Sequence, residues 1–126
     1  MRLLLDTATF LWAISSPERI SRTAMSALKN DTAMREISAI SLSEIAIKQN
    51  AGKLSFSKQD VLQGIADLHL RVLAYTAEHA LGVFGLPLHH RDPFDRQIIA
   101  QAITENISVV TGDRMFRLYK GLAVVW

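Results

Sequence analysis

Four acidic residues occupy positions from which a fold can bring carboxylates together. They are Asp6, Glu44 and Asp113, each close behind a short apolar run, and Asp95, in the first turn of a predicted helix. Gathered carboxylates repel one another, and burial adds a desolvation cost. Unless some are protonated, a cation has to lie among them, and all-oxygen ligands favour Mg²⁺ or Mn²⁺. With such an ion, the chemistry that follows is phosphoryl transfer or phosphodiester cleavage by a metal-activated water.

Each of these acids also has a structural interpretation. In the stretch from His90 to Arg96, Asp92 suits a helix N-cap, Pro93 suits the first helical position, and Asp95 falls three residues after the cap. The other structural assignments are Asp6 and Asp113 as N-caps, and Ser41-x-x-Glu44 as a capping box. A catalytic role therefore becomes the better explanation only if the fold brings all four acids to one edge of the sheet.

Apolar runs of strand length alternate with helical patterns along the chain. Strands are predicted over residues 2–5, 37–40, 71–75, 107–111 and 122–125. Helices are predicted over residues 10–14, 19–29, 45–50, 57–68, 76–84, 92–106 and 114–119. This alternation predicts an α/β fold with a parallel sheet covered on both faces. Right-handed crossovers put the carboxyl ends of all the strands at one edge, where open sheets bind ligands.

Composition sets limits on the class of protein. A chain of 126 residues that is 49% hydrophobic and 21% charged predicts one folded domain over residues 1–126. No apolar run is long enough to span a membrane, and Asp6 cuts the first run too short for a signal peptide, so we expect a cytoplasmic protein. With no cysteine, disulfides, thiolate metal sites and cysteine nucleophiles are excluded. Once the four acids are set aside, the 14 basic residues outnumber the remaining acids by six, which suits a polyanionic partner.

Four blocks of the sequence resemble one known family in order and spacing. The blocks are Leu4-Leu5-Asp6-Thr7, Ser41-Leu42-Ser43-Glu44-Ile45-Ala46-Ile47-Lys48, His90-Arg91-Asp92-Pro93-Phe94-Asp95-Arg96 with Ala100-Gln101-Ala102, and Thr111-Gly112-Asp113. Together they resemble PIN-domain proteins, and more narrowly the VapC-type toxins of bacterial toxin–antitoxin pairs. The resemblance spans nearly the whole chain. It departs at Ser43, where many relatives carry a Trp, a difference that bears on local packing or on a partner surface.

The resemblance implies both a fold and an activity. The implied fold is a three-layer α/β/α sandwich around a parallel sheet of about five strands. The implied activity is a Mg²⁺- or Mn²⁺-dependent endoribonuclease, with structured RNA such as tRNA as a plausible substrate. By position, the metal-holding acids are Asp6, Glu44, Asp95 and Asp113, with Thr111 as a polar neighbour. The implied partners are a small VapB-like antitoxin that blocks the site and a second copy of the chain in a homodimer.

Several other residues invite a functional role. Lys48 follows Glu44 by four residues, which favours an ordinary helical ion pair over a phosphate contact. Arg96 and Arg114 adjoin site acids and suit either RNA phosphate or solvent. The adjacent pair His89 and His90 is interpreted as loop histidines, because neighbouring side chains rarely point at one ion.

Two rival functions stay open at this point. A receiver or an aspartyl-phosphate phosphatase also uses acids at this sheet edge. The phosphatase needs an Asp two residues after Asp6, where Ala8 stands, and the receiver needs one after the third strand, where only Tyr75-Thr76 is found. A catalytically inactive binding module is the other rival, and it has no need of four mutually repelling carboxylates.

Overall fold

The predicted strands pair into one parallel sheet. In the computed structural model, which describes residues 1–126, the strand order is β3-β2-β1-β4-β5. The strands are β1 (Arg2–Leu5), β2 (Met34–Ser38), β3 (Arg71–Leu73), β4 (Ser108–Val110) and β5 (Val124–Val125). The helices are α1 (Thr7–Ser15), α2 (Arg22–Leu28), α3 (Ala39–Asn50), α4 (Lys58–Asp67), α5 (Ala77–Gly82) and α6 (Pro93–Glu105). The 3₁₀ turns are η1 (Pro17–Arg19), η2 (Val83–Gly85) and η3 (Arg114–Leu118).

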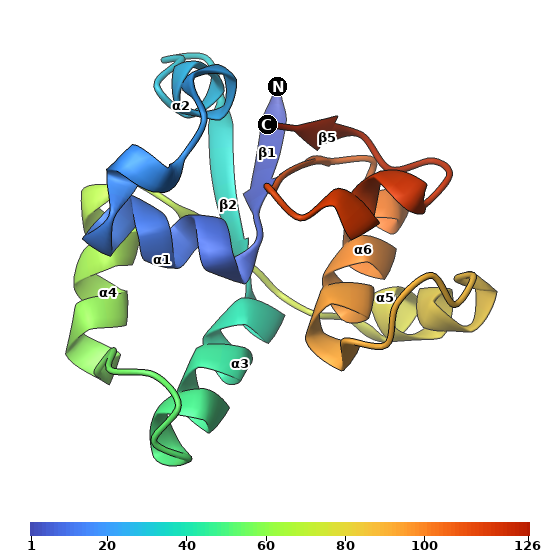
Figure 1. Cartoon of the computed structure of the whole chain (residues 1–126). Helices are drawn as coiled ribbons and strands as arrows, with labels where there is room; N and C mark the ends of the chain where they lie inside the picture. The colour runs from blue at the N-terminus through green and yellow to red at the C-terminus, as the bar shows by residue number, and fades with distance from the viewer.

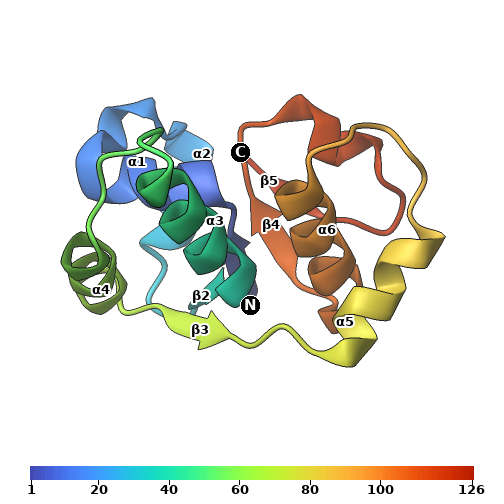
Figure 2. The ribbon, with the colours of Figure 1, turned by 90° about the horizontal axis from the view of Figure 1, so that it is seen from below.

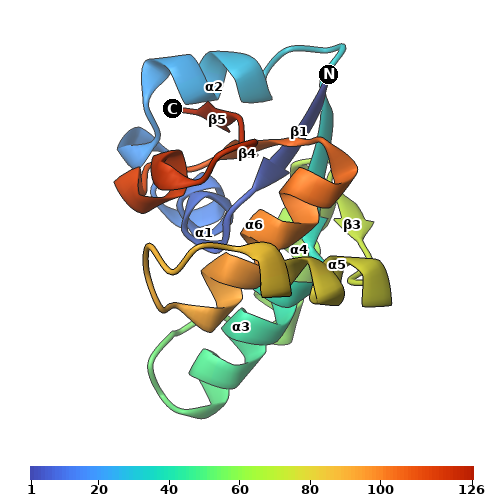
Figure 3. The ribbon, with the colours of Figure 1, turned by 90° about the vertical axis from the view of Figure 1, so that its right-hand side faces the viewer.

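Helices cover both faces of the sheet, as predicted. Figure 1 shows α1, α2 and α4 on one side of β1 and β2, and α5 and α6 on the other. The alternation of strand side chains explains the two cores: Leu4 packs with Ile98 and Ile99 of α6, whereas Leu3 and Leu5 belong to the clusters on the opposite face. Helix α3 extends beyond the carboxyl end of the sheet, as Figure 3 shows, and in the view from below in Figure 2 it lies in front, between α4 and α6. The three-layer α/β/α prediction is confirmed.

The order of the strands locates a crevice. From the central β1 the chain builds outward to β2 and β3, and it then returns to the other side of β1 to build β4 and β5. The direction of winding therefore reverses between β1 and β4. At such a switch point the connecting helices diverge to opposite faces and leave a ligand-sized gap at the carboxyl ends of the strands. Asp6 follows β1 at this point, and Thr111 follows β4.

The second strand begins earlier than predicted, and this changes the role of Ser41. Strand β2 spans Met34–Ser38 instead of residues 37–40, because charged residues occupy its first half and hid it from a search for apolar runs. Helix α3 then starts at Ala39, with the Ser38 hydroxyl accepting the Ile40 N–H at 3.0 Å. Ser41 therefore lies inside the helix, where its hydroxyl accepts from Thr7 Oγ1 at 2.9 Å, and the capping-box interpretation of Ser41 and Glu44 is wrong.

Other boundaries moved by a few residues. The predicted helix over 19–29 begins only at Arg22, because the Ser21 side chain caps it by accepting the Ala24 N–H. The short helix predicted over residues 114–119 is a 3₁₀ helix that spans Arg114–Leu118. Ser43, the departure from the family pattern, is exposed on α3 and so leaves no gap in the core. None of the helices combines the length and the hydropathy that crossing a bilayer demands.

At the amino end of the sheet, buried and partly buried charged side chains are paired with one another by hydrogen bonds. Arg2 on β1 donates twice to the buried Glu36 on β2, at 2.8 and 2.9 Å, and once to Glu105 at the end of α6. His79 Nδ1 accepts the Thr76 N–H, so its Nε2 carries the proton and donates to Glu105 at 2.9 Å. The network therefore ties β1, β2, α5 and α6 together at the end opposite the crevice.

Replacing Glu105 by Gln is expected to weaken the fold in a pH-dependent way. The hydrogen bond from His79 and that from Arg2 lower the pKa of Glu105. Its carboxylate therefore contributes stability above the unfolded-state pKa of about 4.3, and this stability is lost as pH falls through the lower folded-state value. Urea unfolding of E105Q should show a loss of about 1 kcal/mol at pH 7 that shrinks below pH 4. A loss that is the same at both pH values would contradict this role.

Candidate active site

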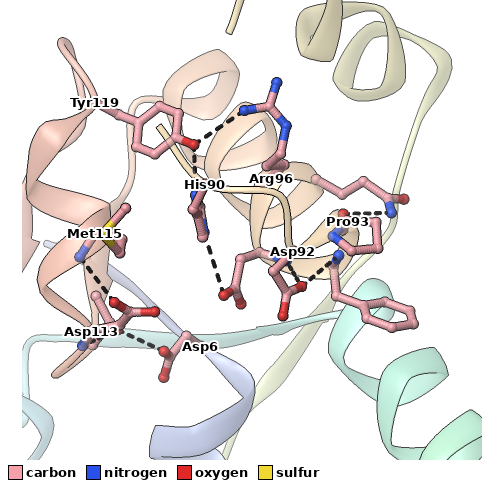
Figure 4. Close-up of polar contacts among 12 residues, drawn as sticks. Asp6, His90, Asp92, Pro93, Arg96, Asp113, Met115 and Tyr119 are labelled. Carbon is pink, nitrogen blue, oxygen red and sulfur yellow. Dashed lines mark hydrogen bonds and ion pairs between the residues drawn. The ribbon is translucent and has the colours of Figure 1, made fainter. Parts of the chain in front are cut away.

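The crevice between β1 and β4 is a pocket of carboxylates. It encloses about 340 Å³, and five acids, Asp6, Glu44, Asp92, Asp95 and Asp113, line it together with Lys48. Figure 4 shows Asp6, Asp92 and Asp113 pointing into the same space from three separate segments. The structure thus brings together all four of the predicted site acids.

Asp6 is held firmly by two donors. It caps α1, where its Oδ1 accepts the Thr9 N–H at 2.9 Å, and its Oδ2 accepts from Thr111 Oγ1 at 2.6 Å. The same Thr111 oxygen accepts the Asp113 N–H at 3.0 Å. The buried Thr111 therefore links the acid after β1 to the acid after β4, which is the neighbouring role predicted for it. The N-cap interpretation of Asp6 is also correct, so its structural and site roles coincide.

Glu44 reaches the pocket from α3, one turn farther into the helix than predicted. Its side chain is buried, and its Oε2 accepts from Lys48 in the i,i+4 ion pair that the sequence favoured. Its other oxygen, Oε1, is buried with no hydrogen-bond partner. A buried carboxylate oxygen without a donor is costly in a finished fold and is expected where an unseen ligand completes the contacts.

The start of α6 places Asp95 beside the other acids. As predicted, Asp92 caps the helix by accepting the Phe94 and Asp95 N–H groups at 2.9 and 3.0 Å, and Pro93 holds the first position. The capped turn then directs the Asp95 side chain at the pocket. Asp113 lies on the opposite rim, exposed, with its Oδ1 accepting the Met115 N–H at 2.9 Å.

The electrostatics of the pocket call for a cation. Burial, together with the negative charges of Asp92, Asp6, Glu44 and Asp113, raises the pKa of Asp95 to about 8. Burial also raises the pKa of Asp6 against the opposing effect of its hydrogen bonds from Thr111 and Thr9. One lysine among five carboxylates leaves the pocket strongly negative, so its acids hold protons or a counter-ion.

The donor set fits a divalent ion of the Mg²⁺ or Mn²⁺ type. Carboxylate oxygens are the ligands such ions prefer, and Glu44 Oε1 and the oxygens of Asp95 have no competing protein donor at hydrogen-bond distance. Ligand atoms of Asp95 and Asp113 lie within 4.8 Å of each other, close enough for the two carboxylates to share a single ion, and His90 lies within the same distance of both. The residues present can therefore hold such a cation.

His90 is the residue near the site that sequence reasoning passed over. Its Nδ1 lies 2.7 Å from the Tyr119 hydroxyl, and its Nε2 lies 3.5 Å from Asp95 Oδ2. The neighbouring His89 is exposed and packs edge-on against Tyr119, as a loop histidine would. The sequence offers no reason to treat the two histidines differently. The hydrogen bond with Tyr119, which follows η3, distinguishes the partly buried His90 from the exposed His89.

The predicted phosphate contacts have different surroundings. Lys48 is paired with Glu44 but lines the pocket, and Arg114 is exposed beside Asp113. Arg96 instead donates to the carbonyl oxygens of Leu86 and Pro87 and to the Tyr119 hydroxyl. The guanidinium of Arg96 thus anchors the loop that carries His90, and a contact of Arg96 with RNA phosphate stays a prediction.

An open α/β sheet with four carboxylates at its switch point defines a candidate divalent-metal site, and comparison with known proteins identifies the family of the chain. The PIN domain family model matches residues 3–122. Ribonuclease VapC22 of Mycobacterium tuberculosis is 31% identical over 121 residues, covering 94% of this chain and 92% of that protein. The chain therefore belongs to the PIN-domain family, and within it to the VapC-type proteins. This membership sets aside the receiver and aspartyl-phosphatase alternatives.

Solved structures of similar fold come from toxin–antitoxin complexes. VapBC2 from Rickettsia felis, bound to a promoter DNA fragment, has a TM-score of 0.72 and 20% identity and covers 98% of this chain and 97% of that one. DNA-bound VapBC from Salmonella typhimurium has the same TM-score and identity, covering 98% and 96%. VapBC-1 from Haemophilus influenzae has a TM-score of 0.70 and 18% identity, with the same coverage. At these identities the likeness establishes the fold.

Removing the Asp95 charge is expected to stabilise the metal-free protein above neutral pH. Because the folded-state pKa of about 8 exceeds the unfolded-state value of about 3.9, the fold binds more protons than the unfolded chain between these limits. The parent's stability therefore falls as pH rises through this window. In EDTA, D95N should gain about 1 kcal/mol or more over the parent at pH 8 and little at pH 4.

The matched control for this measurement is D31N, since Asp31 is an exposed acid outside the pocket. Its unfolding free energy should follow that of the parent at every pH. Parallel curves for D95N and the parent between pH 4 and pH 8 would show that the pocket does not penalise the Asp95 charge.

Proposed function

We propose that this chain is the toxin of a toxin–antitoxin pair and acts as a divalent-metal-dependent endoribonuclease. The observation that carries the proposal is the pocket at the switch point, which the four family-matched acids line and where one oxygen of Glu44 is buried without a partner. The 31% identity to a ribonuclease along almost the full length of both chains supports RNA as the substrate.

Asp6, Glu44, Asp95 and Asp113 are the residues that would hold one or two ions, directly or through water. When bound, Mg²⁺ or Mn²⁺ supplies a Lewis acid for the phosphodiester and lowers the pKa of a water molecule. Thr111 keeps Asp6 oriented through its 2.6 Å hydrogen bond, and Lys48 keeps one oxygen of Glu44 engaged. The protein's own contribution is thus a set of carboxylates fixed before substrate arrives.

The rim of the pocket suits a polyanionic substrate. Lys48 lines the pocket, and Arg114 is exposed next to Asp113 in the chain. We propose that Lys48 and Arg114 contact RNA phosphates on either side of the bond that is cut. A structured RNA such as tRNA is the substrate that the resemblance to VapC-type toxins suggests.

The proposed partners follow from the family. The similar solved structures are complexes of VapC-type chains with their antitoxins. We propose that a VapB-like antitoxin binds this chain and blocks the acidic pocket, and that the chain forms a homodimer. The proposed place of action is the cytoplasm, where such a toxin meets cellular RNA and where a chain without cysteine loses nothing to reduction.

Substituting a site acid is expected to abolish cleavage without unfolding the protein. Purified parent chain should cleave labelled RNA with Mg²⁺ or Mn²⁺ and stop in EDTA. D6N and D95N should each lose about 100-fold or more in rate, since each removes charge that binds the ion. D31N is the matched control and should retain the parent rate.

Circular dichroism and urea unfolding of the same preparations test whether the fold survives. The D6N preparation also reports any contaminating nuclease, because a contaminant would still cleave RNA in a preparation whose own site is inactive. A fully active and equally stable D6N protein would refute the assignment of the site.

A further inference from the structure

The loop before α6 carries a histidine wedged between a tyrosine and a site acid. His90 is 13% exposed at its side chain, with Tyr119 Oη 2.7 Å from Nδ1 and Asp95 Oδ2 3.5 Å from Nε2. Its ring also packs against the rings of Phe116 and Tyr119. Figure 4 shows Arg96, Tyr119 and His90 joined in series above the acidic pocket.

The contacts of Tyr119 determine which nitrogen of His90 carries a proton. Arg96 Nη1 lies 3.1 Å from the Tyr119 hydroxyl, and since a guanidinium only donates, the hydroxyl oxygen is the acceptor there. The hydroxyl hydrogen is then free to be donated to His90 Nδ1. With Nδ1 accepting, neutral His90 carries its hydrogen on Nε2, the nitrogen that faces Asp95.

The opposite tautomer leaves a buried donor without a partner. If Nδ1 carried the hydrogen, the Tyr119 oxygen would accept from both Arg96 and His90, and the tyrosine hydrogen would have nowhere to go. Tyr119 is only 3% exposed, and no other contact of its hydroxyl is present. In the Nε2–H form the tyrosine hydrogen is donated to Nδ1 and the imidazole hydrogen faces the Asp95 carboxyl group at 3.5 Å, so this form is favoured.

Asp95 is the one predicted ligand without a firm hydrogen bond of its own. Asp6 accepts from Thr9 and Thr111, and Asp113 accepts from Met115. Glu44 accepts from Lys48. The carboxyl group of Asp95 receives no donor within normal hydrogen-bond distance, and His90 Nε2 is correspondingly buried without a partner. These two unsatisfied groups face each other across 3.5 Å.

We propose that His90 is a positioning residue for the metal-binding site, whose Nε2–H orients the Asp95 carboxylate and leaves its second oxygen free for the ion. Tyr119 and Arg96 act through His90 by fixing its tautomer. The inference rests on the proposed metal-dependent function. It also gives Arg96 a role at the site that needs no contact with RNA.

The tautomer is directly observable in the full-length chain. In ¹⁵N-resolved NMR spectra of the imidazole, His90 should show a protonated Nε2 and an unprotonated Nδ1, both without metal and with Mg²⁺. His89 provides the internal comparison, because its exposed ring has no such constraint. A spectrum with the proton on Nδ1 would overturn the proposal.

Metal affinity tests the positioning role apart from catalysis. Mn²⁺ binding by the parent, measured by calorimetry and by the loss of the free-ion EPR signal, should weaken about 10- to 100-fold in H90F, as is typical when the hydrogen-bond partner of a ligand is removed. H90Q, whose amide offers a donor at a similar reach, should recover part of the loss. H89F is the matched control and should bind as the parent does.

A double-mutant cycle tests whether Tyr119 acts through His90 or whether its loss simply destabilises the protein. Y119F removes only the hydroxyl, and it should weaken Mn²⁺ binding in the parent background but not in H90F, since the tyrosine acts through the histidine. Equal effects of Y119F in both backgrounds would contradict the series. The comparison holds even if H90F itself is less stable, because urea unfolding of each variant identifies any loss of folded protein.

The outcomes distinguish this inference from the proposed function. If D95N loses Mn²⁺ and RNA cleavage while H90F matches the parent, the nuclease assignment stands and the role of His90 is refuted. A nitrogen coupling to bound Mn²⁺ that vanishes in H90F would identify His90 as a direct ligand and overturn the positioning role. Failure of the parent to bind Mn²⁺ would refute the proposed function itself.

Discussion

Mutual repulsion among the carboxylates at the end of the central strands is the constraint around which this structure is built. Five acids line one pocket, and a single lysine opposes them. The fold holds them in place with hydrogen bonds from Thr9 and Thr111, with an ion pair from Lys48, and with a capped helix start at Asp92. What these contacts leave uncompensated is visible in Asp95, whose pKa rises to about 8.

The two ends of the sheet treat buried acids in opposite ways. At the amino end, the buried Glu36 is paired by Arg2 through two hydrogen bonds, and Glu105 accepts from both Arg2 and His79. At the carboxyl end, the equally buried Glu44 keeps one oxygen without any partner. A carboxylate whose oxygens all accept hydrogen bonds contributes to the fold, whereas one with an unpartnered oxygen can still bind a ligand. This contrast, more than the count of acids, separates structural from functional carboxylates in the chain.

The sequence located the site better than it located the elements that carry it. Asp6 and Asp113 could be placed because abrupt strand ends are visible in sequence, and Asp95 because an N-cap and a proline mark the helix start. Glu44 was predicted to join the other acids from an incorrect strand boundary, since the charged first half of β2 hid the true strand, and its side chain does line the same pocket. The capping box with Ser41 failed for the same reason, because α3 begins three residues before it could act.

The role of His90 could not be predicted, because it depends on a contact with a residue 29 positions away. Only the fold brings Tyr119 within hydrogen-bond distance of Nδ1, and only the contact of Arg96 with Tyr119 supports the proposed tautomer. Arg96 likewise looked like a phosphate ligand because it adjoins a site acid in sequence, while its guanidinium binds the carbonyls of the preceding loop. The spacing of residues in the sequence thus predicts where a helix starts or a strand ends. It does not predict which groups a long side chain such as that of Arg96 contacts.

Anomalous diffraction from crystals of the full chain grown with Mn²⁺ tests the central claim most directly. The account predicts an anomalous peak in the pocket between β1 and β4. Carboxylate oxygens from the set Asp6, Glu44, Asp95 and Asp113 should lie at coordinating distance from it. A well-ordered pocket at saturating Mn²⁺ with no anomalous peak among these carboxylates would contradict it.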